Sequence, residues 1–335
     1  MDRLKRKYLL LEDGSPDELY HSIDCLEKIF YHALCDFEHV DKKYAFCDDI
    51  NIRTHRSESG FGVDLNKLRL NDSLFIKTEF KPSPQDAFDI IEEFIDKGHI
   101  VAICTMFDRL KPYSWYQHPD KIDVSNTHFC LIVGYDEHNV YFVDDPSMLV
   151  QERLIKHQSN PTIGVIDKKS LIEAFSEYCM ILTVQINQPE LSHIDKFDAV
   201  LNSIKENYRN CSVKNKNGTH TITGRNALMA ISMFARNPAS FEFAAKNFFP
   251  VYLFARKREI FKLCLLDKIN DYSYAEDTIS ILEENIAAWK GLHLLFCKHD
   301  VSAYDNIRMR AKQQFECIID SEDALMDSIA QMERI

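Results

Sequence analysis

Three residues of the types used in cysteine-dependent acyl chemistry stand far apart in this chain. Cys25 lies near the predicted start of a helix, and His128 opens a strand-like run that extends to Asp136. A second run begins at Val140 and closes at Asp144, so the two runs predict a hairpin with a histidine and a carboxylate at the same end. In such a triad a thiolate attacks a carbonyl, an imidazole moves the proton and a carboxylate orients the imidazole. A plain strand histidine and a plain turn are the competing interpretation, and spacing alone leaves both open.

The predicted helix around the cysteine has a clear start signal. Asp24 is a good N-cap, and Glu27 three residues later completes a capping-box pattern. The apolar residues that follow have helical spacing: Leu26, Ile29, Phe30, Ala33 and Leu34. Cys25 would then occupy the first turn, where unpaired backbone N–H groups and the helix dipole favour a thiolate. The alternative is an unreactive buried helix cysteine.

Composition indicates a soluble globular protein. The chain has 335 residues, of which 45% are hydrophobic and 27% charged, which suits about two domains. With 40 Lys and Arg against 52 Asp and Glu, the net charge of −12 argues against nucleic acid or an anionic membrane as the main partner. No apolar run approaches the ~18 residues of a membrane span, and the run Tyr8–Leu11 is too short for a signal peptide. We therefore expect a cytoplasmic location.

The ten cysteines do not suggest a metal site. They include no C-x-x-C pair, so a structural zinc site is not predicted. In a reducing compartment most of them are expected to be small buried residues, with one or two reactive at most.

The hydrophobic pattern predicts an α+β region of about residues 1–188. Helices are expected from Ser83 to Gly98 and over 169–178, strands over 99–107, 162–166 and 180–186, and irregular structure over 40–80. The loop of residues 108–127 is rich in aromatics, so Tyr113, Trp115 and Tyr116 could form a substrate wall or lid.

Residues 189–335 are expected to form an all-α domain that begins after the boundary signal Asn187–Pro189. Helical stripes run near 194–208, 224–236, 239–267, 275–299, 302–319 and 321–334. Arg256, Lys257 and Arg258 form the sharpest basic cluster of this acidic chain. A solvated helix face is the favoured interpretation of that cluster, and a docking patch for an acidic carrier protein is the alternative.

Several motifs together resemble one known family. Gly98–Ala102, the aromatic loop, Thr127–Asp136 and Val140–Asp144 are similar to the papain-like domain of the butirosin biosynthesis protein H family. That family is related to the peptidase domains of bacteriocin-exporting transporters. Asp24 and Cys25, and less clearly Gly60–Gly62, stand where the family has its cysteine helix and glycine loop. The similarity covers roughly residues 15–185, with a vaguer likeness around residues 224–228 and Trp289 in the C-terminal region.

The resemblance implies a papain-like fold and an acyltransferase of natural-product biosynthesis. In the named member, an aminoacyl group moves from a carrier-protein thioester, carried on a phosphopantetheine arm, to an amine of an aminoglycoside. By position, Cys25 would be the nucleophile, His128 the base and Asp144 the orienting carboxylate. Asp145, which adjoins a proline, is the alternative, but strand parity with Val140 favours Asp144. The resemblance implies no metal and no organic cofactor, and the sequence leaves the oligomeric state open.

One position departs from the papain-like pattern. Such enzymes usually carry a glutamine about six residues before the cysteine, and this chain has Leu19 there. The oxyanion would then be held by the Cys25 backbone N–H together with Tyr20 or His21. Because losing one such donor typically lowers the rate by ~10²–10³-fold, slow transfer from an activated thioester is favoured over fast proteolysis. A thioesterase, amidase or peptidase with water as acceptor, and a carrier-binding protein without turnover, are the alternatives.

Overall fold

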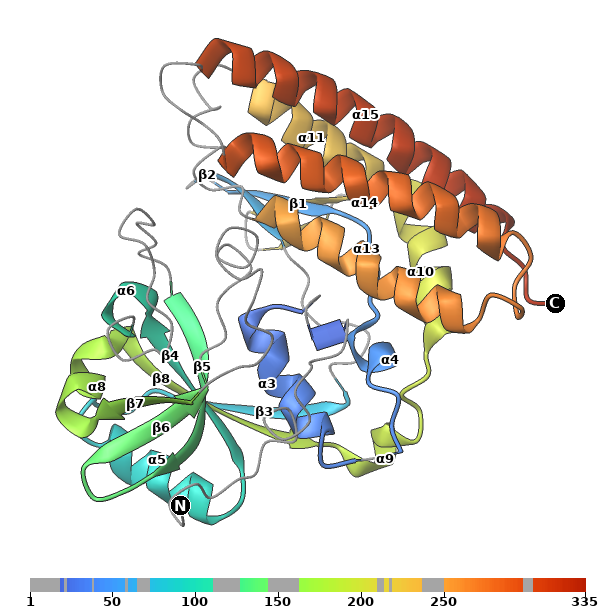
Figure 1. Cartoon of the computed structure of the whole chain (residues 1–335). Helices are drawn as coiled ribbons and strands as arrows, with labels where there is room; N and C mark the ends of the chain where they lie inside the picture. Colours follow the sequence, from blue (N-terminus) through green and yellow to red (C-terminus); the bar gives the residue numbers. More distant parts are fainter. Residues whose placement is uncertain are drawn as a thin grey trace. The chain divides into compact units, whose positions relative to one another are not determined.

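The computed structural model describes two compact units of an α+β protein. The described residues are 19–20, 23–37, 39–57, 60–64, 73–110, 127–143, 163–209, 214–216, 219–236, 250–297 and 304–335. Unit 1 comprises Met1–Lys42 and Asp72–Ile194, and unit 2 comprises Lys43–Asn71 and Asp195–Ile335. Figure 1 shows the elements of both units.

Unit 1 is built on an antiparallel sheet of six strands in the order β3-β8-β4-β5-β6-β7. The strands are β3 Phe75–Phe80, β4 Ile100–Met106, β5 Thr127–Tyr135, β6 Asn139–Val143, β7 Ile163–Asp167 and β8 Phe175–Ile186. The helices of this unit are α3 Cys25–Leu34, α5 Ala87–Asp96, α6 Phe107–Leu110, α8 Lys168–Ala174 and α9 Gln188–Leu191.

The sheet of unit 1 is covered on both faces. One face packs with α5, α6 and α8 around a core that contains Ile91, Leu171 and Phe142. The other face receives α3, which packs against β4, β5 and β8. Figure 1 shows α3 and α5 on opposite sides of the strands. Because both faces are buried, β4 is buried at nearly every position, which explains its continuous apolar run.

The predicted hairpin is present as β5 and β6, and a side chain fixes its turn. The carboxylate of Asp136 accepts hydrogen bonds from the backbone N–H groups of His138 and Asn139, at 2.8 and 2.9 Å. The Tyr141 hydroxyl donates to the same carboxylate at 2.6 Å. A local carboxylate therefore replaces the missing backbone partners of the turn.

Unit 2 combines helices with a small antiparallel sheet. Its strands are β1 Arg53–Ser57, β2 Gly60–Asp64, β9 Lys214–Lys216 and β10 Thr219–Thr223, in the order β2-β1-β10-β9. Its helices are α4 Lys43–Phe46, α10 Phe197–Arg209, α11 Gly224–Arg236, α13 Pro250–Asp267, α14 Ala275–Cys297 and α15 Tyr304–Gln331. The long helix α14 packs against both α13 and α15.

The expected all-α character of residues 189–335 is wrong at one hairpin. Strands β9 and β10 lie in this region and join β1, with Thr54 opposite Ile222. The sequence Asn217-Gly218 between them, followed by alternating threonines, is a hairpin signal that helical periodicity obscured. Residues 40–80 likewise contain β1, β2 and β3 rather than only irregular structure.

The described units differ from the expected boundary in the segment Lys43–Asn71, which belongs to unit 2. Lys43 forms an ion pair with Asp267 of α13. The Ile50 carbonyl accepts a hydrogen bond from Arg258 at 3.2 Å. These side-chain contacts join residues more than 200 positions apart, so no local pattern could indicate them.

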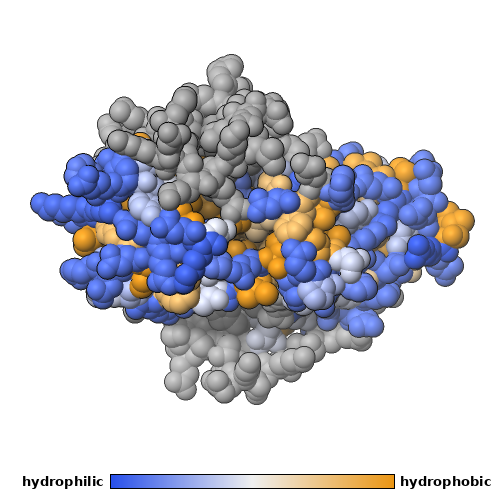
Figure 2. Space-filling model, turned by 90° about the horizontal axis from the view of Figure 1, so that it is seen from below, coloured by the Kyte–Doolittle hydropathy of each residue, from blue (hydrophilic) through white to orange (hydrophobic). Residues whose placement is uncertain are grey.

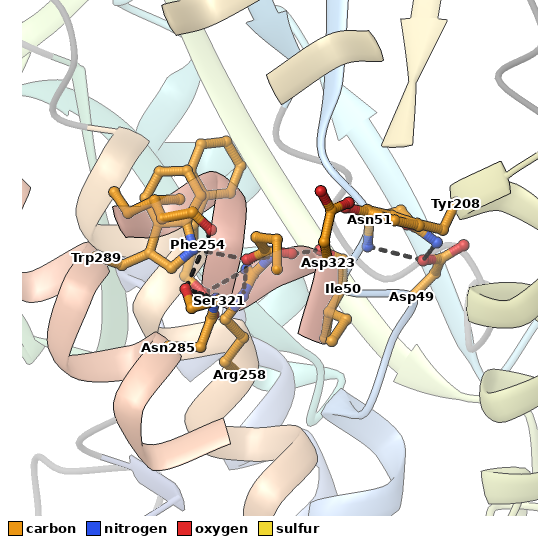
Figure 3. A network of polar contacts seen from close by, with 12 residues as sticks. Asp49, Ile50, Asn51, Tyr208, Phe254, Arg258, Asn285, Trp289, Ser321 and Asp323 are labelled. Atoms are coloured by element: carbon orange, nitrogen blue, oxygen red, sulfur yellow. Dashed lines mark hydrogen bonds and ion pairs between the residues drawn. The ribbon is translucent and has the colours of Figure 1, made fainter. Parts of the chain in front are cut away.

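The basic cluster of α13 is not a solvated face. Arg256 pairs with Glu259 and Lys257 with Asp48, and both basic side chains are mostly buried. Arg258 is fully buried, and its guanidinium pairs with Glu322 of α15, which is buried as well (Figure 3). The Trp289 indole N–H donates to the same Glu322 carboxylate at 2.8 Å, and the Phe254 carbonyl accepts from Arg258 at 2.9 Å. Because each charge is paired and hydrogen-bonded, the network is tolerable in the interior.

Smaller differences concern element ends. The helix expected from Ser83 begins at Ala87, because residues 83–86 form a turn in which the Asp86 N–H donates to the Ser83 carbonyl. Helix α8 ends at Ala174, since β8 already begins at Phe175. The two helices expected near 302–319 and 321–334 form the single helix α15.

Among the described residues, no helix combines the length and apolar character needed to cross a bilayer. Hydrophilic residues make up much of the coloured surface in Figure 2. The large apolar side chains that are exposed within the described ranges come from many different elements: Ile76, Val165, Met233, Leu266, Tyr274, Leu294, Met309 and Ile335. Single exposed apolar residues of this kind are ordinary in globular proteins.

Arg258→Ala should destabilise unit 2 by roughly 3–5 kcal/mol, because it leaves the Glu322 carboxylate buried without its counter-charge. Arg258→Met combined with Glu322→Gln should lose less, since no charge is stranded. Urea unfolding in a Trp115→Phe background leaves Trp289, which contacts this network, as the single tryptophan reporter. Arg334→Ala, a control in the same unit, removes an exposed pair with Asp198 and should change stability by less than about 0.5 kcal/mol. Equal effects of Arg258→Ala and Arg334→Ala would contradict the structural role given to the buried pair.

Candidate functional site

The start of α3 is the best-defined feature around Cys25. The predicted capping box is confirmed, because the Asp24 carboxylate accepts from the Glu27 N–H at 2.8 Å and the Glu27 carboxylate accepts from the Asp24 N–H at 2.9 Å. The Lys28 N–H donates to the Asp24 carbonyl at 2.9 Å, which is the first intrahelical bond. The N–H groups of Cys25 and Leu26 precede that bond and have no acceptor within the helix.

Cys25 is half-buried and lines a pocket between α3 and the sheet. The pocket is small and partly open to solvent. Phe129, Leu131 and Val143 form its wall on β5 and β6. A thiol at a capped helix start, beside a pocket that opens to solvent, can present its sulfur to an acyl group that enters from outside.

The geometry of β5 separates His128 from this pocket wall. Successive side chains of a strand point to opposite faces, and β5 pairs with β4 without interruption from Thr127 to Ile132. Phe129 and Leu131 line the Cys25 pocket, whereas Cys130 and Ile132 belong to the core on the α5 side. By this alternation the buried His128 lies on the α5 side.

The structure therefore brings Cys25 beside the residue that follows His128, and His128 is not among the described residues that line the pocket. The residue opposite His128 on β4 is Thr105, whose hydroxyl donates to the His128 carbonyl at 3.3 Å. The pairing of the thiol with the His128 imidazole stays a prediction.

Most of the other predicted site residues lie outside the described residues. These are His21, Tyr113, Trp115, Tyr116, Asp144 and Asp145. The described part of β6 ends at Val143, one residue before the predicted orienting carboxylate. Tyr20 is described, is almost fully buried, and lines the pocket.

Two pocket residues were missed by sequence reasoning, Lys28 and His32. Both lie on α3 with Cys25, three and seven positions further along the helix. That spacing places them on the same helical stripe as the cysteine, so the signal was present in the sequence. Sequence reasoning had assigned the helix only an apolar face.

The surroundings of the other described cysteines separate them from Cys25. Within the described ranges Cys35 is half-buried and Cys317 exposed, while Cys47, Cys104, Cys130, Cys179 and Cys264 are buried. Burial raises the pKa of the Cys179 thiol to about 11. A hydrogen bond with Cys264, followed by burial, raises the pKa of the Cys47 thiol well above its ordinary value. These two thiols are therefore poor nucleophiles at neutral pH.

Comparison of the sequence with known families and curated proteins found no match that bears on this site. The chain matches no model of a known protein family, and it matches none of the curated proteins. The likeness to the butirosin biosynthesis protein H family therefore rests on the motifs in the sequence.

Asp24→Ala should destabilise the start of α3 by about 1 kcal/mol, because the Glu27 N–H loses its acceptor. Asp24→Asn should retain most of that stability, since asparagine caps helices nearly as well. Amide hydrogen exchange resolved to residues 25–28 measures the effect. Unchanged protection in Asp24→Ala would show that the cap does not hold Cys25 in place.

Asp136→Ala should lower the stability of unit 1 in a pH-dependent way. The Tyr141 hydroxyl and the His138 N–H hold the pKa of Asp136 well below its ordinary value in the folded state. The stabilisation is therefore present above about pH 4, the unfolded value, and is lost as pH falls through the folded one. Urea midpoints should differ most between the parent and Asp136→Ala at pH 7, and the gap should shrink in acid. Glu137→Ala, an exposed neighbour in the same turn, is the control. A gap that is constant down to pH 3 would contradict this prediction.

Proposed function

We propose that this protein is a cysteine-dependent acyltransferase with a papain-like catalytic unit, in which Cys25 carries the acyl group. The observation that carries the proposal is the position of Cys25: a half-buried thiol in the first turn of a capped helix, at a pocket against an antiparallel sheet. A helix that bears the nucleophile and packs on such a sheet is the arrangement that the motif resemblance implies.

The proposed reaction has two steps. The Cys25 thiolate attacks the carbonyl of a carrier-protein thioester, and the carrier's phosphopantetheine thiol leaves with a proton. The acyl group is then a thioester on Cys25. An amine acceptor attacks that carbonyl, the amide forms, and the Cys25 sulfur leaves and is regenerated.

The developing oxyanion has donors at the helix start. The N–H groups of Cys25 and Leu26 have no acceptor within α3 and lie at the positive end of the helix dipole. Donors that are fixed before the reaction stabilise the charge without reorganisation. They support oxyanion binding in a chain that carries Leu19 where papain-like enzymes usually have glutamine.

The proposed base is His128, with Asp144 as its orienting partner. The pocket itself contains His32, but seven helical positions correspond to about 10 Å along the axis, which is too far for direct proton transfer from the thiol. The motif resemblance alone names His128, since the alternation along β5 places its side chain on the face of the sheet away from Cys25.

The test is acylation of the whole chain by a carrier protein loaded with an acyl thioester, followed by candidate amines. We expect a mass increase at Cys25 that is absent in Cys25→Ser, and amide product when an amine is added. Free acid in place of amide would identify a thioesterase, amidase or peptidase of the same fold. Labelling spread over several cysteines, or none, would indicate a carrier-binding protein and overturn the proposal.

His128→Ala should reduce the acylation rate of Cys25 by roughly 10²-fold or more, the usual contribution of a general base. His138→Ala is the matched control, because His138 is an exposed histidine in the turn of the same hairpin. Equal rates in the two variants would remove His128 from the mechanism. A larger loss in His32→Ala would transfer the role of base to the pocket histidine.

A further inference from the structure

The pocket beside Cys25 has walls of two different kinds. One wall is a single stripe of α3, with Cys25, Lys28, Ile29 and His32 at successive positions of the same helical face. Two of these four side chains, Lys28 and His32, can carry a positive charge. Both are nevertheless almost fully buried, with 6% and 4% of their surface exposed.

An aromatic side chain holds the cationic side of the pocket in place. The Lys28 ammonium nitrogen lies 4.5 Å from the centre of the Tyr20 ring, a favourable cation–π distance. The His32 ring meets the Tyr20 ring edge-on, with centroids 5.8 Å apart. Tyr20 is itself only 1% exposed, so this arrangement is packed rather than loose.

The opposite wall is apolar and consists of Phe129, Leu131 and Val143. An acyl chain that extends from the Cys25 sulfur along α3 would have this wall on one side. On the other side it would pass Lys28 after about 4.5 Å of helix and reach His32 after about 10 Å. The walls therefore suit methylene groups next to the thioester and an anionic group one or two helical turns away.

We propose that Lys28, supported by Tyr20 and His32, recognises a carboxylate at the far end of the acyl group that Cys25 accepts. The substrate class is then the monothioester of a short dicarboxylic acid. Lys28 would donate a charge-assisted hydrogen bond to the free carboxylate while the chain packs on the apolar wall. This inference rests on the proposed acyl transfer to Cys25 and adds the acyl group to it.

The test compares two small thioesters of N-acetylcysteamine. One carries a glutaryl group, with a free carboxylate, and the other a pentanoyl group of the same length without charge. In each reaction the Cys25 sulfur takes the acyl group and N-acetylcysteamine leaves as a thiol. Intact mass spectrometry over time gives the rate of acylation for each donor. The parent protein should react with the glutaryl donor at least about tenfold faster, as expected for a hydrogen bond between charged groups.

Lys28→Met should remove this preference, so that the ratio of the glutaryl rate to the pentanoyl rate falls to about one. Lys97→Met, the same change at an exposed lysine of unit 1, should keep the preference. The comparison of the two donors on the parent protein does not depend on how well Lys28→Met folds. Raising the salt concentration should reduce the preference only slightly, because the ammonium is buried.

The outcomes separate this inference from the function on which it rests. Equal rates for both donors on the parent protein would overturn carboxylate recognition while leaving Cys25 as the nucleophile. A preference that persists in Lys28→Met would assign recognition to another group and overturn the role of Lys28. Absence of Cys25 acylation by either donor and by a loaded carrier protein would overturn the proposed function, and this subsite with it.

Discussion

The alternation of side chains across the six-stranded sheet is the constraint on which the architecture of unit 1 depends. Both faces are buried at the centre of the sheet, so β4 and β5 must supply apolar residues in both directions. On β5, Cys130 and Ile132 enter the core with α5 and α8, while Phe129 and Leu131 face α3. The residues that meet Cys25 are therefore decided by strand parity, because a shift of one residue exchanges the two faces.

Two features of α3 set the surroundings of Cys25: the residue at which the helix begins, and the residues on the face that the cysteine shares. The capping box sets the residue at which α3 begins, and this places Cys25 in the first turn. The spacing of three and seven residues then places Lys28 and His32 in the same pocket as the thiol. A nucleophile and the residues proposed to recognise its substrate thus share one rigid element, and their relative positions depend mainly on helix geometry.

Unit 2 depends on a different interaction, the buried pair of Arg258 and Glu322. The pair connects α13 with α15, and through the Ile50 carbonyl it also fixes the segment that precedes β1 (Figure 3). Burying two charges requires that both find full sets of partners, which Trp289 and Phe254 help to provide. A cluster that looks like a surface feature in the sequence is consequently an internal one.

Local patterns in the sequence determined the features that depend on neighbouring residues. The cap of α3, the hairpin of β5 and β6, and most helices of residues 194–335 follow from hydrophobic periodicity, capping residues and turn residues, all of which act within about one helical turn or one hairpin. Only the tertiary structure decided the pairing of β1 with β10, the burial of Arg258, and the assembly of Phe129, Leu131 and Val143 beside Cys25. These contacts join residues that are distant in the chain. Their formation depends on which faces pack together, and that choice minimises exposed apolar surface and unpaired polar groups over a whole unit rather than within any one segment.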